Sequence, residues 1–168
     1  NIRLKYRYLD LRREDMKRNI LARSNTFKSI RNSMDSLSFL ELDTPTLTKS
    51  TPEGAKDFLV PSRKQSGSFY ALPQSPQMYK QLFMISGFNK YYQIAKCYRD
   101  EDSRKDRQPE FTQLDLEILN GTPDEVKKTT ETIVKELLDN VFSIKVDVPF
   151  RDMTYKEAIE NFNGNNNT

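Results

Sequence analysis

The chain has 168 residues, of which 36% are hydrophobic and 30% are charged, and its formal net charge is +3. This composition indicates a soluble globular protein with a proper core, and no apolar run approaches the length that spans a membrane. Histidine is absent and Cys97 is the single cysteine, which excludes within these residues an internal disulfide, a Ser–His or Cys–His catalytic pair and a histidine zinc site.

The first third of the sequence predicts a basic lead-in, a long helix and a short extended segment. Residues 1–13 place arginines and lysines among tyrosines and leucines, and a segment that joins domains is the default interpretation. Residues 14–37 predict a helix, and its apolar stripe is Met16, Ile20, Phe27, Ile30, Met34 and Leu37. Residues 39–42 extend toward Pro45, because proline disfavours helix at the residue before it.

The next part predicts a loop, two short strands and a second helix. Pro52 and Gly54 indicate a loop within residues 48–63, with strands expected at 58–60 and 69–72. Ser75 is a good helix cap, Pro76 suits the first helical position and Gly87 is a fitting end. The stripe that we expect this helix to bury is Met78, Leu82 and Ile85.

Residues 91–99 and 111–119 predict an antiparallel hairpin around a charged loop, residues 100–110. Alternation puts Gln113, Asp115 and Glu117 on one face of the second strand, and with Arg99 nearby they would form a polar floor. For a hairpin of unknown context, a solvated sheet face explains the same pattern and is the better interpretation of the residues alone.

The last part predicts two capped helices and a strand between them. Thr122, Pro123 and Glu125 combine a cap, a first-turn proline and a capping-box glutamate, and Thr154 to Glu157 is a second capping box. Residues 144–148 alternate as a strand, and residues 163–168 predict a disordered tail. The stripe expected to be buried on the first of these helices is Val126, Ile133, Val134, Leu137 and Val141.

The hairpin carries a resemblance to a known family. Residues 98–101, the charged loop and residues 107–111 read Tyr-Arg-Asp-Glu, then Arg-Gln-Pro-Glu-Phe, which resembles motif 2 of the class II aminoacyl-tRNA synthetases. This sequence is similar to that of the aspartyl-tRNA synthetases of the bacterial and mitochondrial type. It favours the aspartyl enzymes over the asparaginyl and lysyl enzymes. The long helix, strand and proline resemble motif 1. The resemblance implies an α+β fold, an antiparallel sheet flanked by helices.

In that family, aspartate is activated by ATP and passed to the 3′ end of tRNA. By resemblance Arg99 is the catalytic residue, because it bridges the α-phosphate and the substrate carboxylate. Arg107 would hold the γ-phosphate and Phe111 would stack on adenine. Glu101 and Gln108 would lie on the ATP side. Mg²⁺ would neutralise the polyphosphate, and no protein metal site is expected.

The segment Gln74-Ser75-Pro76-Gln77-Met78-Tyr79-Lys80 matches the family's aspartate-binding helix. Lys80 would reach the side-chain carboxylate of the substrate, although a lone lysine there also suits a helix surface. Asp115 would meet the substrate ammonium, and Glu53 would face the same group. The full set implied for aspartate binding is Glu53, Ser75, Gln77, Lys80, Arg99, Gln113 and Asp115.

The resemblance also sets expectations about organisation and partners. Residues 1–13 would be the linker from an anticodon-binding domain, and residues 14–162 a partial catalytic domain that lacks motif 3, so that the 168 residues alone would not be a competent enzyme. The end of the sequence departs from the family pattern. L-Aspartate, ATP, tRNA(Asp) and a second copy, through the motif 1 helix, are the expected partners, in the cytoplasm or the mitochondrial matrix and not at a membrane. The alternative is a non-catalytic, synthetase-derived module that binds tRNA or a partner.

Overall fold

The computed structural model describes residues 2–51, 54–102 and 104–162. The chain divides into two units, one made of residues 1–39 and 121–150 and the other of residues 40–120 and 151–168. Within the described ranges, none of the helices combines the length and the apolar character needed to cross a bilayer.

The first unit begins with two short helices, α1 (Ile2–Lys5) and α2 (Arg7–Asp10). Asp10 is buried there although it is charged. Its carboxylate accepts hydrogen bonds from Arg3 at 2.8 Å and from Arg7, and Arg13 lies 3.5 Å from it. These arginines lower the pKa of Asp10, with the hydrogen bond from Arg3 as the largest cause. The residues expected to join domains therefore fold locally around one carboxylate.

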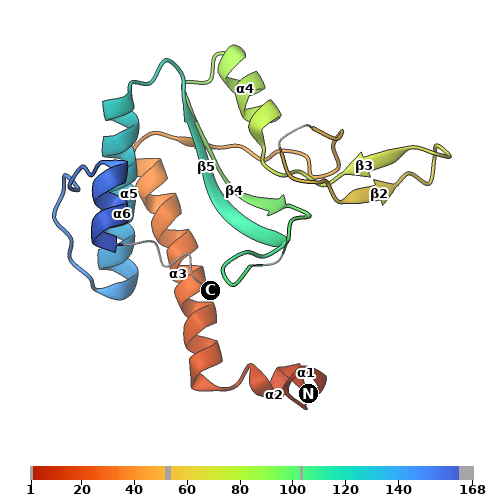
Figure 1. Cartoon of the computed structure of the whole chain (residues 1–168), viewed down its shortest axis with the longest axis horizontal. Helices are drawn as coiled ribbons and strands as arrows, with labels where there is room; N and C mark the ends of the chain where they lie inside the picture. The colour runs from red at the N-terminus through yellow and green to blue at the C-terminus, as the bar shows by residue number, and fades with distance from the viewer. Residues whose placement is uncertain (1, 52–53, 103, 163–168) are drawn as a thin grey trace. The chain divides into compact units, whose positions relative to one another are not determined.

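The core of this unit lies between α3 (Glu14–Ser36) and α5 (Pro123–Phe142), which run side by side (Figure 1). Ile30, Met34 and Ile133 are its buried apolar residues, and side-chain hydrogen bonds also join the two helices. Asn140 donates to Ser29 Oγ at 3.3 Å, and Ser33 donates to Glu136. Both helices confirm the predicted spans. Their stripes are buried only in part, because Ile20 and Val126 are exposed toward the ends of the helices where α3 and α5 begin.

Residues 143–150 correct one prediction. They form no strand, although Ile144, Val146 and Val148 alternate as predicted. A strand needs a partner to receive its backbone hydrogen bonds. Here Phe150 N–H instead donates to Glu131, a buried acid of α5, at 2.9 Å. The segment is therefore held by a side chain of the helix before it.

The second unit is built on a three-stranded sheet in the order β1 (Leu40–Glu41), β4 (Lys90–Tyr98), β5 (Glu110–Ile118). β4 and β5 form the predicted antiparallel hairpin, with Gln93 opposite Asp115 and Cys97 opposite Phe111 (Figure 1). β1 joins β4 in parallel. Helices with an antiparallel pair confirm the α+β class, and the parallel β1 is an addition that the sequence pattern did not indicate.

Two further parts of this unit precede the long hairpin. β2 (Leu59–Pro61) and β3 (Phe69–Ala71) pair antiparallel, close to the predicted positions. Helix α4 (Gln77–Ile85) begins one residue later than predicted, after Pro76. The predicted stop, Gly87, follows two residues after its end, and its φ of +94° is a left-handed conformation that favours glycine.

The stripe predicted for α4 is wrong. Met78, Leu82 and Ile85 are 53%, 52% and 82% exposed, whereas Lys80 and Met84 are buried. The helix turns the face with Lys80 toward β4 and β5, which it contacts. Residues i and i+4 lie on one helix face, so Lys80 and Met84 are buried together.

The last helix, α6 (Tyr155–Phe162), confirms its capping box. Thr154 N–H donates to Glu157 Oε2 at 2.8 Å, and Glu157 N–H donates to Thr154 Oγ1 at 3.2 Å. The tail at 163–168 lies outside the described residues.

Candidate functional site

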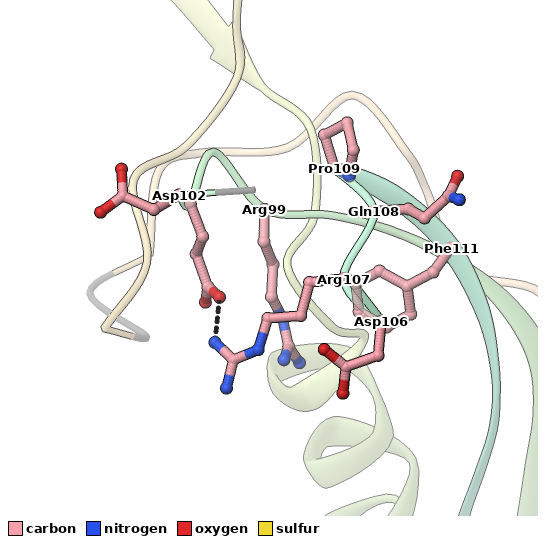
Figure 2. A pocket seen from close by; sticks show the side chains of 8 residues that line it. Arg99, Asp102, Asp106, Arg107, Gln108, Pro109 and Phe111 are labelled. Atoms are coloured by element: carbon pink, nitrogen blue, oxygen red, sulfur yellow. Dashed lines mark hydrogen bonds and ion pairs between the residues drawn. The ribbon is translucent and has the colours of Figure 1, made fainter. Parts of the chain in front are cut away.

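The loop of the long hairpin encloses a cavity of about 520 Å³ (Figure 2). Its base is set where the backbone of Arg99 donates to Pro109 O at 2.9 Å, just beyond the last paired residues of β4 and β5. The residues that line it are Arg99, Glu101, Asp102, Asp106, Arg107, Gln108, Pro109 and Phe111. The volume falls within the range of small-molecule sites.

Two arginines dominate this loop cavity. The guanidinium of Arg99 lies over the ring of Phe111, 4.9 Å from its centroid, a cation–π arrangement. Arg107 Nη1 pairs with Glu101 Oε2 at 2.9 Å, the contact drawn as a dashed line in Figure 2. Both guanidinium groups point the same way in that view, whereas Asp102 and Gln108 point away from them. The cavity thus presents two planar cations, which suit phosphate and carboxylate oxygens.

The charge of the lining also carries information. Two arginines stand against three carboxylates, Glu101, Asp102 and Asp106, so that the lining has a formal charge of −1. A polyanion that entered the cavity would bring further negative charge beside these acids. The arginines alone do not balance it, and an additional cation would be favourable there.

A second group of charges is buried on the β5 face that α4 covers. Lys80 Nζ lies 3.0 Å from Asp115 Oδ1 and 3.2 Å from Glu117 Oε2. Lys80 is 9% exposed and Asp115 is 7% exposed. Burial acts to lower the pKa of Lys80, but the hydrogen bonds and charges of Asp115 and Glu117 outweigh it and raise that pKa. The lysine of α4 is therefore held charged beneath the helix rather than on its surface.

One oxygen in this group has no partner. Asp115 Oδ1 accepts from Lys80 and, at 3.4 Å, from Gln113 Nε2. Asp115 Oδ2 is buried without a hydrogen bond from any described residue. The neighbouring hydroxyl of Tyr91 donates to Gln93 Oε1 at 2.9 Å instead. A buried carboxylate oxygen without a donor is costly, and a donor from a ligand would satisfy it.

Both groups lie on the same face of β5. Phe111, Gln113 and Asp115 alternate along the strand, so their side chains leave the sheet on one side. Asp115 lies four positions after Phe111, which corresponds to roughly 14 Å at the usual strand rise. The loop cavity and the buried lysine are thus the two ends of one sheet face, and a single elongated ligand could reach both.

Comparisons with known proteins give the family of the chain. The family model described as tRNA synthetases class II (D, K and N) matches residues 1–168. The chain belongs to this family. The resemblance seen in motifs 1 and 2 is therefore confirmed.

Similar proteins are named aspartate–tRNA ligases. An aspartate–tRNA ligase of Agathobacter rectalis is 54% identical over 162 residues, and one of Clostridium botulinum is 56% identical over 162 residues. An aspartate–tRNA(Asp/Asn) ligase of Thermodesulfovibrio yellowstonii is 52% identical over 161 residues. Each alignment covers 96% of this chain and 27% of the relative, so the chain spans about a quarter of their length.

In the structure, most of the predicted site residues lie in one of two groups. The five residues expected on the ATP side all line the loop cavity, namely Arg99, Glu101, Arg107, Gln108 and Phe111. Lys80, Gln113 and Asp115 meet through hydrogen bonds. Ser75 and Gln77 lie at the start of α4, where Ser75 Oγ accepts from Gln77 N–H at 3.3 Å. Glu53 lies outside the described residues.

Sequence reasoning missed several polar side chains near these groups. Glu117 was placed on the polar floor without a role, yet it is the second partner of Lys80. Asp57 and Gln74 received no role either, although Gln74 is 2% exposed and bonded to Asp57. The signal available for Gln74 was its place in the Gln-Ser-Pro-Gln segment, beside residues that had been assigned.

Proposed function

We propose that the protein to which this chain belongs activates L-aspartate with ATP and transfers it to tRNA(Asp). The observation that carries the proposal is Asp115 Oδ2, which is buried beside Lys80 and accepts no hydrogen bond from a described residue, on the sheet face that ends at the two-arginine cavity. The ammonium of aspartate could bind Asp115, and its α-carboxylate could bind the arginines of the loop cavity. The names of the relatives, aspartate–tRNA ligases, support aspartate and tRNA as substrates.

In the first step, an oxygen of the α-carboxylate attacks the α-phosphorus of ATP. A carboxylate–phosphorus bond forms, the bond to the bridging oxygen breaks, and pyrophosphate leaves. Catalysis here requires alignment of the two reactants and neutralisation of phosphate charge rather than a covalent enzyme intermediate. In the second step a ribose hydroxyl at the 3′ end of tRNA attacks the carbonyl, loses its proton and displaces AMP.

Arg99 is assigned the central role, because a planar guanidinium can hold phosphate and carboxylate oxygens together. Phe111 would stack on adenine, using the ring face that Arg99 leaves open. Arg107 would leave Glu101 for the γ-phosphate, an exchange of one charge-assisted contact for another. Gln108 would turn inward toward the nucleotide.

On the amino-acid side, Lys80 would hold the side-chain carboxylate of aspartate and Asp115 its ammonium. Gln113 fixes the Asp115 carboxylate by its hydrogen bond. Gln77 lies one turn before Lys80 on α4, on the same helix face. Glu53 and Ser75 complete the proposed set.

Mg²⁺ is implied by the family and fits the donor chemistry of the cavity. Within the described ranges no three His, Cys, Asp or Glu side chains are grouped to hold a metal by themselves. Asp106 lines the cavity on the side of the two guanidinium groups (Figure 2), and Mg²⁺ is commonly held by one or two carboxylates together with substrate phosphates. When bound, the ion would neutralise polyphosphate charge that the lining, at −1, does not balance.

The longer relatives support the wider assignment. We propose that residues 14–162 belong to a catalytic domain and that a second copy packs on α3, where Ile20 and Leu21 are 51% and 61% exposed. The reported relatives are bacterial, which favours a bacterial cytoplasm over a mitochondrial matrix. One relative, at 54% identity, is named aspartate–tRNA ligase and another, at 52%, aspartate–tRNA(Asp/Asn) ligase, so identity alone does not decide whether tRNA(Asn) is also charged.

The test is a calorimetric titration of the full-length protein with a non-hydrolysable aspartyl-adenylate analogue, followed by aspartate-dependent pyrophosphate exchange. We expect tight binding, and at least 100-fold weaker binding of the asparaginyl and lysyl analogues, because a buried cation without its carboxylate is costly. Equal binding of all three would refute the aspartate assignment. A protein that binds none of them and catalyses no exchange would be a non-catalytic interaction module.

A further inference from the structure

Gln74 is a buried polar side chain that none of the roles above uses. It is 2% exposed and lies between β3 and α4. Both ends of its amide are engaged by the backbone of Ala55. Ala55 N–H donates to Gln74 Oε1 at 3.3 Å, and Gln74 Nε2 donates to Ala55 O at 2.9 Å. The side chain thus binds one backbone residue as a neighbouring strand would.

The same amide also holds a charge. Gln74 Nε2 donates to the carboxylate of Asp57, which accepts a second hydrogen bond from Ser50. Burial acts to raise the pKa of Asp57, but these hydrogen bonds outweigh it and lower the pKa. Asp57 is therefore held ionised, and charge-assisted hydrogen bonds of this kind are stronger than neutral ones.

The segment that Gln74 holds is bonded in turn to the end of β4. Lys56, between the two bonded residues, accepts at its carbonyl from Asp100 N–H at 3.0 Å. Pro73, the residue before Gln74, accepts from Tyr98 N–H at 2.9 Å. These two hydrogen bonds fix the backbone of Tyr98 and Asp100, the residues on either side of Arg99.

A second cavity, of about 470 Å³, lies between this segment and the hairpin loop. Gly54, Ala55 and Lys56 form one part of its lining. The rest comes from the hairpin loop, and three of those residues also line the first cavity, namely Glu101, Asp102 and Arg107. The segment held by Gln74 and the candidate nucleotide site therefore share three residues of the hairpin loop.

We propose that Gln74 is a positioning residue for Arg99. It fixes residues 55–57, which fix the backbone of Asp100 and so the direction in which Arg99 leaves the end of β4. This inference rests on the proposed function, because it is Arg99 that would align ATP and aspartate. Gln74 itself touches neither.

The first test measures the backbone and needs no activity. In the full-length protein, Gln74→Met keeps the side-chain size but removes all three hydrogen bonds, and Gln81→Met is the matched control on the exposed side of α4. By hydrogen–deuterium exchange, the amides of Ala55 and Asp100 should exchange at least tenfold faster in Gln74→Met only. Unchanged exchange at Asp100 would overturn the proposal.

The second test separates positioning from loss of folded protein. In pyrophosphate exchange, Gln74→Met should raise KM for ATP and lower kcat, with about a tenfold or greater loss in kcat/KM, since small misplacements of an aligning group are costly. KM for aspartate should rise as well, because Arg99 is also assigned to the carboxylate of aspartate. A lower kcat with both KM values unchanged would indicate only less active protein and would contradict the positioning role.

Two further arms keep the outcome decisive. If Gln74→Met does not fold, Asp57→Asn is measured instead, and Asp100 exchange should rise by a smaller factor; no rise would count against the proposal. If the unsubstituted protein shows no exchange activity, the proposed function fails, while the exchange rates at Ala55 and Asp100 still decide whether Gln74 holds the end of β4.

Discussion

The two ends of the β5 face differ in how they hold charge. In the loop cavity, Arg107 and Glu101 form an ion pair with side chains 52% and 34% exposed. Under α4, Lys80 and Asp115 form one with side chains 11% and 7% exposed. An exposed pair contributes little and rearranges at low cost, whereas a buried pair resists change because breaking it strands a charge.

This difference suits the two substrates that we propose. A polyphosphate is long, flexible and hydrated, and the exposed Arg107 can exchange Glu101 for it at low cost. Aspartate is small, and selecting it over asparagine or lysine requires buried groups of fixed charge. A wrong amino acid would leave those buried charged groups without a partner, which is costly. The buried end would therefore set specificity, and the loop end would bind and align the nucleotide.

The largest effect should come from breaking the buried pair. Lys80→Met keeps the length of the side chain but leaves Asp115 and Glu117 without their cation. We expect a loss of about 3–5 kcal/mol in the free energy of unfolding. Urea denaturation of the full-length protein measures it. Lys96→Met is the matched control, because Lys96 pairs with Glu110 in the open, and it should cost less than about 1 kcal/mol. Equal losses for the two variants would erase the distinction between the ends.

The next effect concerns the loop end and should appear in catalysis rather than stability. Arg99→Ala in the full-length protein should reduce aspartate-dependent pyrophosphate exchange by about 10²–10³-fold, as removal of a preorganised donor to developing negative charge does. Its melting temperature should stay close to that of the parent. Arg63→Ala, on the exposed β2–β3 connection, is the control. Near-normal exchange in Arg99→Ala would refute the role of Arg99.

The smallest effect is a pH dependence confined to the buried end. The folded-state pKa of Lys80 is raised, and burial followed by the charge of Asp115 raises the pKa of Tyr91. Both groups bind protons more tightly when folded, so their contribution is complete below pH 10 and is lost as pH rises above it. Stability measured from pH 8 to 11 should fall less steeply in Tyr91→Phe than in the parent. A parent slope of zero would contradict the prediction.

Sequence was sufficient where a structural signal is local. The cap at Thr122, the capping box of Thr154 and Glu157, and the stop at Gly87 all form as predicted. Their hydrogen bonds or dihedral angles involve residues at most a few positions apart, so the local sequence contains everything they need. The faces of β5 were predictable for the same reason, since alternation is a property of the strand itself.

Packing was decided only by the tertiary structure. Spacing correctly identified α4 as a helix but indicated Met78, Leu82 and Ile85 as its buried face, and the structure buries the face with Lys80 and Met84. Apolar spacing shows that a helix has a stripe, but the neighbours determine which face is covered. Residues 144–148 likewise alternate, yet form no strand because no partner strand receives them.

The candidate site divides along the same line. The residues of motif 2 and of the Gln-Ser-Pro-Gln segment could be named in advance, because family wording fixes their order along the chain. Their partners could not, because Lys80 meets Asp115 across 35 positions and Gln74 meets Ala55 across 19. Hydrogen bonds over such separations depend on how strands and helices pack. That packing determines which partners the charged side chains of the site meet.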